Sequence, residues 1–255
     1  MLVAATLFWR AWLASRPPLI DIGGQRLEAR VQGTGRPPVV FEAGFEGAMH
    51  PFEALQASVA EHTQTLVYQR AGYGRSDAGP PPRTAQQAAR DLRGLLTALG
   101  IRPPVVLVCY GVGCLFSRVF AHDYPSEIAG LVFIDAASAS VYADPRARQA
   151  LARNLTAGAR REWAALAATV DEARSAWPLP SVPYVVITAM KPNGAWPLVA
   201  RGDMDAWLKE QQALLGRLGG PTHIIFPKAD HVSVLNEKDV ARAIVELAAR
   251  IKAQS

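Results

Sequence analysis

The sequence predicts an α/β fold in which helices cover both faces of a mostly parallel sheet. Runs such as 39–41, 104–108 and 131–134 are apolar throughout, as in strands that are buried on both sides. Stretches with the apolar spacing of helices separate these runs. Such alternation is typical of a parallel sheet between two helical layers, and 255 residues suffice for one domain of this kind.

Each expected element follows from its local pattern. Gly23-Gly24 predicts a hairpin turn between the first two strands, Thr84 is a typical helix cap, and Gly100 ends the helix that Thr84 begins. We expect strands at 19–22, 26–31, 39–41, 65–68, 104–108, 131–134, 184–187 and 224–226. We expect helices at 52–61, at 84–99, from the end of the 104–108 run to 124, at 203–218 and at 238–252.

The stretch between residues 134 and 183 has no strand character. Residues 147–177 instead have helical spacing, with apolar side chains at Leu151, Leu155, Trp163, Leu166 and Val170. An insertion at the carboxyl end of a strand lies over the crevice in which α/β sheets bind ligands. We therefore expect a core of residues 18–135 and 183–255, with 136–182 as a short helical lid.

The charge of the chain says little about its partners. The net charge is +5 and the pI is near 9.5, but the longest uninterrupted basic run is Arg160-Arg161. Nucleic-acid-binding proteins gather basic residues into a patch or stripe. We therefore expect a small-molecule substrate or ligand and no nucleic-acid partner. The sequence gives no indication of the oligomeric state.

We expect neither a metal nor another cofactor. The five histidines are spread apart along the chain, and Gly72-x-Gly74 lacks the following helix and acidic residue of a dinucleotide site. The spacing of Cys109 and Cys114 suits neither a disulfide framework nor a four-ligand zinc site. These two cysteines are expected to be small buried hydrophobic residues.

The amino-terminal segment 1–17 is the one stretch whose apolar composition suggests contact with a membrane. Residues 1–14 are nearly all apolar, with Arg10 as the one charge, but a bilayer-spanning helix takes about 20 apolar residues. Three alternatives stand: a helix packed on the body, which we favour, an anchor in the membrane interface, or the remnant of a longer anchor. The localisation is accordingly either cytoplasmic or membrane-associated through residues 1–14.

Five segments together resemble the α/β-hydrolase superfamily, in its esterase-like and epoxide-hydrolase-like branch. They are Phe-Glu-Ala-Gly-Phe at 41–45, Arg-Ala-Gly-Tyr-Gly-Arg-Ser-Asp at 70–77, the strand, turn and helix at 105–119, Leu-Val-Phe-Ile-Asp at 131–135, and His231. The resemblance runs from about 18 to 254. It implies a cofactor-independent hydrolase of esters or amides, while the lid residues Trp163, Leu166 and Trp177 predict a small, largely apolar substrate.

The central motif of that superfamily departs from its pattern. Gly-x-Ser-x-Gly places a serine on a sharp turn between strand and helix, whereas residues 109–114 read Cys-Tyr-Gly-Val-Gly-Cys. Gly111 stands at the nucleophile position, so covalent serine hydrolysis is not expected of the chain as written. We expect Cys109, Cys114 and Ser117 to be packing residues rather than substitute nucleophiles.

The rest of the catalytic machinery has candidates in the expected order. The resemblance makes His231 the general base and Asp135 the acid that orients it, with Asp144 as the alternative acid. The backbone N–H groups of Phe45 and Val112 would form the oxyanion hole.

Other residues near the expected site are further candidates for the base and for the pocket lining. Glu46 and His50 are further candidate bases, since the nucleophile is missing. Trp163, Leu166 and Trp177 are expected to line the substrate pocket from the lid.

Three hypotheses explain Gly111. The chain is an engineered knockout of a serine enzyme, although Cys109 also departs from the motif, where a knockout needs one change. Alternatively it is a natural variant in which His231 activates water or abstracts a proton without a covalent intermediate. The third hypothesis is a non-catalytic protein that binds an apolar ligand beneath the lid. The sequence does not decide between them.

Overall fold

The computed structural model describes residues 16–45, 49–136, 152, 155–192 and 204–254. The predictions for 1–14, Glu46 and Asp144 lie outside these residues. None of the described helices combines the length and the apolarity needed to cross a lipid bilayer.

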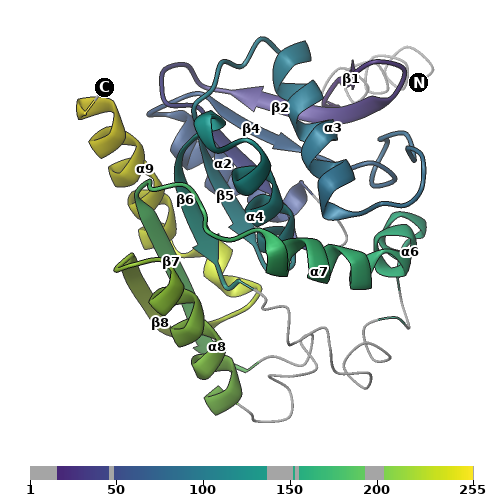
Figure 1. The fold of residues 1–255 in the computed structure, drawn as a ribbon. Helices are drawn as coiled ribbons and strands as arrows, with labels where there is room; N and C mark the ends of the chain where they lie inside the picture. Colours follow the sequence, from purple (N-terminus) through teal and green to yellow (C-terminus); the bar gives the residue numbers. More distant parts are fainter. Residues whose placement is uncertain (1–15, 46–48, 137–151, 153–154, 193–203, 255) are drawn as a thin grey trace, which may run out of the picture.

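Eight strands form one sheet in the order β1-β2-β4-β3-β5-β6-β7-β8 (Figure 1). The first two strands pair antiparallel with their neighbours, and every pair from β4 to β8 is parallel. The strands are β1 (Leu19–Asp21), β2 (Arg26–Gln32), β3 (Val39–Glu42), β4 (Thr65–Tyr68), β5 (Val105–Tyr110), β6 (Ile128–Ile134), β7 (Tyr184–Lys191) and β8 (Thr222–Asp230).

Helices cover both faces of this sheet. The α-helices are α2 (Glu53–Ala60), α3 (Ala85–Ala98), α4 (Gly113–Asp123), α6 (Ala157–Ala164), α7 (Leu166–Ser175), α8 (Met204–Arg217) and α9 (Lys238–Ala253). The described residues also include the short 3-10 helices η1 (His50–Phe52), η2 (Pro125–Glu127) and η6 (Ser233–Asn236). Figure 1 shows α3, α4 and α7 on the near side of the sheet.

The central strand β5 shows why two hydrophobic cores form. Its side chains alternate, so that Leu107 packs with α3, α4 and α7, whereas Val106 and Val108 pack with α2 and α9. All three side chains are fully buried. Because successive strand residues point to opposite faces, an all-apolar strand requires a helical layer on each side. The predicted α/β class is confirmed.

Some element boundaries differ from the prediction. β7 and β8 are longer than expected because their parallel pairing continues to Lys191 and Asp230. The helical stretch expected at 147–177 is described as two helices, α6 and α7, which meet at Ala165. The division into a core and a lid at 136–182 stays a prediction.

Candidate active site

Gly111 forms the turn between β5 and α4. Its φ of +53° lies in the left-handed region, which glycine adopts at no steric cost, and its N–H donates to the carbonyl of Ile134 at 3.1 Å. A Cβ added at residue 111 would lie 3.2 Å from Cε1 and 3.3 Å from Nε2 of His231. The structure therefore brings the histidine predicted to be the base to the position predicted for the nucleophile.

Gly113 makes this turn compact. A Cβ at this residue would lie 2.4 Å from the carbonyl oxygen of Ala43, so only glycine lets the start of α4 approach the end of β3 so closely. The same approach brings the amino end of α4, with the N–H of Val112, beside the segment that carries Phe45. These are the two segments expected to supply the oxyanion hole.

Asp135 holds the imidazole of His231 from the other side. His231 Nδ1 lies 2.5 Å from Oδ2 of Asp135, while Oδ1 accepts the N–H of Ala189 at 3.0 Å. The Asp135 side chain is almost wholly buried, and its backbone has a φ of +47°. A carboxylate accepts hydrogen bonds, so Nδ1 carries the hydrogen, and Nε2 is the nitrogen that faces Gly111.

Tyr110 also contacts His231, and this role of Tyr110 was not predicted from the sequence. Its ring stacks on the imidazole with centroids 4.4 Å apart and planes at 21°, and its hydroxyl donates to the His231 carbonyl at 2.7 Å. Burial, reinforced by the charge of Asp135, raises the pKa of Tyr110 far above its ordinary value, so the hydroxyl stays a donor. The only signal in the sequence is the position of Tyr110 immediately before Gly111.

Behind the Phe45 segment lies a buried ionic network centred on Arg70. Arg70 donates to Glu42 Oε1 at 2.6 Å, and it donates to both carboxylate oxygens of Glu162 at 2.6 and 2.8 Å. The side chains of all three residues are 2–3% exposed. Tyr73 donates its hydroxyl to Glu162 at 2.7 Å, and Tyr68 donates to Glu42. The network thus ties α6 to the sheet.

Arg70 also fixes the backbone before Phe45. It donates to the carbonyl of Ala43 and, at 2.9 Å, to the carbonyl of Gly44. The Gly44 carbonyl and the Phe45 N–H belong to one planar trans peptide group, so they point in opposite directions. A guanidinium that binds the carbonyl therefore directs the N–H away from itself and polarises it as a donor.

The cysteine prediction was wrong. Cys109 and Cys114 form a disulfide across the turn, with Cα atoms 4.9 Å apart. Cysteine spacing alone does not indicate this bond, which forms because the tight turn folds the start of α4 back onto the end of β5. The disulfide leaves neither sulfur as a thiolate nucleophile. Ser117 is buried on α4, and its hydroxyl has no hydrogen-bond partner among the described residues.

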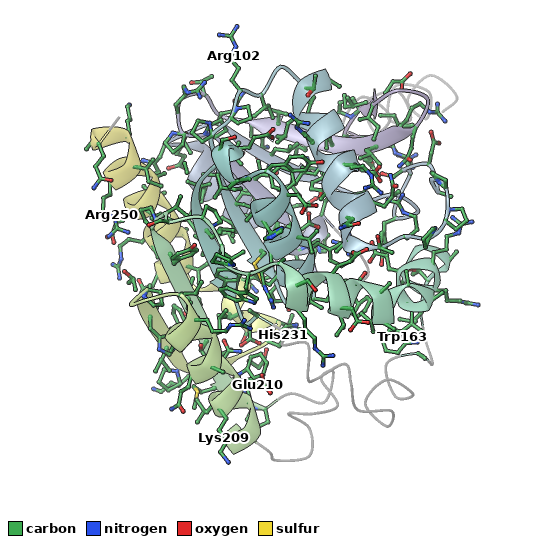
Figure 2. The ribbon with its side chains drawn as sticks, viewed as in Figure 1. Arg102, Trp163, Lys209, Glu210, His231 and Arg250 are labelled. Atoms are coloured by element: carbon green, nitrogen blue, oxygen red, sulfur yellow. A yellow bond between two sulfur atoms is a disulfide. The ribbon has the colours of Figure 1, made fainter. Side chains whose placement is uncertain are left out.

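The remaining predicted residues divide between two ends of the sheet. Trp163 packs its ring 5.6 Å from that of Phe45, and Figure 2 shows Trp163 and His231 along the same edge of the molecule. Leu166 is buried in the core. Trp177 does not lie near His231. It lines a cavity together with the segments that precede β7 and β8, because α7 packs along α3 and α4.

His50, the other candidate base, is exposed and pairs with Glu53 at 3.2 Å. The imidazole of His50 thus contacts a carboxylate at the surface rather than the turn at Gly111. Within the described residues, no group of three or more His, Cys, Asp and Glu side chains is arranged to hold a metal ion.

The chain belongs to the α/β-hydrolase family. The family model described as alpha/beta hydrolase fold matches residues 37–176, more than half of the chain. This stretch contains Arg70, Gly111 and Asp135. The parallel sheet, the sharp turn after β5 and the late histidine agree with that membership.

Curated relatives include proteins named as hydrolases. The chain is 29% identical over 141 residues to 2-(acetamidomethylene)succinate hydrolase of Mesorhizobium japonicum, covering 55% of this chain and 49% of that one. It is 30% identical over 106 residues to the uncharacterized protein YqjL of Bacillus subtilis, covering 42% of each. These matches span less than half of the length of either relative.

Solved structures share the fold over most of the chain. A thermophilic esterase from Thermogutta terrifontis superimposes with a TM-score of 0.64 at 18% identity, covering 93% of this chain and 99% of that one. An enol-lactonase from Burkholderia xenovorans gives 0.60 at 19% identity, covering 92% and 100%. At these identities the likeness shows the fold alone.

Proposed function

We propose that this protein is a hydrolase of small, largely apolar esters or amides, in which His231 activates water directly without a covalent acyl intermediate. One observation carries the proposal: His231 is paired with buried Asp135, and its Nε2 lies 3.3 Å from the position of a Cβ at Gly111. Burying a carboxylate costs free energy. The buried Asp135 is paired with His231, a general base directed at the turn, which favours a catalytic role for the pair.

The chemistry follows from these positions. A substrate water beside Gly111 lies within hydrogen-bond reach of Nε2, which takes its proton as the oxygen attacks the carbonyl carbon. The N–H groups of Phe45 and Val112 stabilise the negative oxygen that forms. When the bond to the leaving group breaks, the imidazolium returns the proton to the departing alcohol or amine.

The disulfide favours a natural variant over an engineered knockout. The position of the first motif glycine holds Cys109, which is bonded to Cys114, so the turn differs from the family pattern in a way that one serine-to-glycine change does not explain. The paired Asp135 and His231 favour a base over a passive binding protein, because a binding pocket needs no oriented imidazole.

The substrate class rests on the lining and on the relatives. Phe45 and Trp163 present aromatic rings on the side of the expected oxyanion hole, which suits an apolar acyl or ring group. The name of the curated relative 2-(acetamidomethylene)succinate hydrolase supports hydrolytic chemistry.

Hydrolysis of p-nitrophenyl acetate tests the proposal. We expect turnover above the buffer rate that falls about a hundredfold in His231→Ala, since a positioned general base contributes roughly 10²–10⁴-fold. Asp135→Asn should lose activity as well, because the imidazole loses the carboxylate that orients it. The measurement is the initial rate of p-nitrophenolate release across pH 5–9.

His122→Ala is the matched control, because His122 lies on the surface at the end of α4 beside Asp123. It should keep the parental rate. Equal rates for the parent and His231→Ala would overturn the proposal, and so would a parent no faster than buffer.

A further inference from the structure

A second cluster of polar side chains gathers at Trp177, directly after α7. The guanidinium carbon of Arg118, from α4, lies 4.8 Å from the centroid of its ring, and that of Arg217, from α8, lies 4.2 Å from it. Trp177 and Arg217 line the same cavity. Three elements that are distant in sequence thus bring two cations to one aromatic ring.

The two cations are not neutralised by acidic side chains. Within the described residues, neither Arg118 nor Arg217 forms an ion pair with a carboxylate. Burial, with the like charge of Arg217 nearby, lowers the pKa of Arg118 to about 10, so the Arg118 guanidinium remains charged at neutral pH. Two cations held this close without an anion are an unfavourable arrangement in the unliganded protein.

The cluster also contains hydrogen-bond donors that lack acceptors. Arg118 is 8% exposed and donates to the carbonyl of Ala173, but its Nε has no partner among the described residues. The indole N–H of Trp177 is buried and equally unpaired. Buried donors without acceptors are rare in proteins and cost free energy, so their concentration at one place points to a missing acceptor.

The cavity beside the cluster has the size of a small-molecule site. Its volume is about 420 Å³, within the range of roughly 300–1,000 Å³ for ligand pockets. Its walls are the proline-rich segment 178–183, Tyr184 and residues 217–221. The Tyr184 hydroxyl already donates to the Pro180 carbonyl, whereas Arg217 lines the cavity and is exposed to solvent.

We propose that this cavity binds a small molecule through an oxyanion, either a carboxylate or a phosphate group. The Arg217 guanidinium offers the forked donor geometry that both groups accept, and the negative charge relieves the repulsion with Arg118. The apolar part of the ligand lies against Trp177 and the prolines. The site precedes β7 and β8, at the opposite ends of these strands from His231, so it does not depend on the proposed hydrolysis.

Titration followed by ¹H–¹⁵N NMR tests the site, with inorganic phosphate and acetate as the probes. The indole cross-peak of Trp177 is assigned by its loss in Trp177→Phe, and ionic strength is held constant with sodium chloride. We expect this cross-peak to move saturably with at least one probe while the Trp163 indole does not. A response to phosphate alone identifies a phosphoryl ligand, and one to acetate alone identifies a carboxylate.

Arg217→Gln should weaken the binding at least tenfold, and it should fold normally because Arg217 is exposed. Arg250→Gln removes another exposed charge, on the outer side of α9, and should leave the affinity unchanged (Figure 2). No saturable shift with either probe, an equal shift with chloride, or an unchanged affinity in Arg217→Gln would each overturn the proposal.

Discussion

Residue 111 sets the chemistry available at the turn after β5. With a φ of +53°, glycine occupies this backbone region freely, whereas an L-amino acid there is strained. In enzymes with a serine at this turn, that strain is part of the price of an exposed nucleophile. Here the backbone keeps the sharp turn without the strain, and His231 approaches the space that a side chain would take.

Gly111→Ser should therefore lower the free energy of unfolding by about 1–3 kcal/mol, the cost of a left-handed non-glycine residue. The new Cβ, only 3.2–3.3 Å from the His231 ring, adds to this cost unless the ring moves by a few tenths of an ångström. Urea denaturation measures the difference.

Gly216→Ser is the control for that prediction. It lies in α8, where an added Cβ meets no atom within 4 Å and φ is not in the left-handed region. Its stability should stay level or rise slightly, because glycine is a poor helix former. If Gly111→Ser were as stable as its parent, the strain assigned to the turn would be absent.

At the scale of elements, Arg70 joins β3, the loop after β4 and helix α6. Its two carboxylate partners come from residues 42 and 162, which are far apart in sequence. Because this pairing is buried, removing the cation leaves two carboxylates without compensation. The same cation orients the peptide before Phe45, so its loss affects stability and the proposed oxyanion hole together.

Arg70→Met should destabilise the protein by about 3–5 kcal/mol, the range for breaking a buried ion pair at one partner. The stability of Arg70→Lys should lie between those of the parent and Arg70→Met, since an ammonium group keeps the charge but not the forked geometry. Thermal and urea denaturation measure both. Arg90→Met, which removes an exposed arginine of α3, should cost little, and a comparably small loss for Arg70→Met would contradict the network's role.

The β7–β8 pair contains a titrating group. His223 on β8 lies 2.9 Å from the Thr188 hydroxyl on β7, and burial lowers the pKa of His223 below its ordinary value of 6.5. The unfolded chain then binds this proton more tightly than the folded protein. The contribution of neutral His223 to the free energy of unfolding is complete above pH 6.5 and is lost as the pH falls below that value.

His223→Gln removes this titration while keeping a polar side chain beside Thr188. We expect the urea midpoint to fall less between pH 7.5 and pH 5 in the variant than in the parent. His62→Gln, at an exposed position before β4, should retain the parental pH dependence. Identical pH dependence in the parent and His223→Gln would show that His223 does not contribute.

At the scale of the whole molecule, local patterns were enough for the fold. Apolar strands and Thr84 at a helix start predict the sheet, and the resemblance to the α/β hydrolases predicts His231 beside Asp135 and Gly111. These residues meet because the carboxyl ends of parallel strands lie at one edge of the sheet. The bond between Cys109 and Cys114 escaped prediction because it depends on how sharply the backbone turns.

Contacts between distant elements were beyond sequence reasoning for a related reason. Arg70 belongs to a recognised motif, yet nothing local indicates that Glu162 of α6 reaches it. Trp177 is a residue type that often lines pockets, but the direction of α7 along α4 places it at the other end of β7. Which side chains meet depends on helix packing directions, which a single sequence does not encode locally.

Intact-protein mass spectrometry during turnover of p-nitrophenyl acetate tests the central claim most directly, with Gly111→Ser as the positive control for acylation. Samples quenched in acid during steady turnover should contain only the unmodified parent protein, while p-nitrophenolate accumulates at a rate that depends on His231. A parent protein that gains one acetyl group during turnover would instead reveal a covalent nucleophile and contradict direct activation of water by His231.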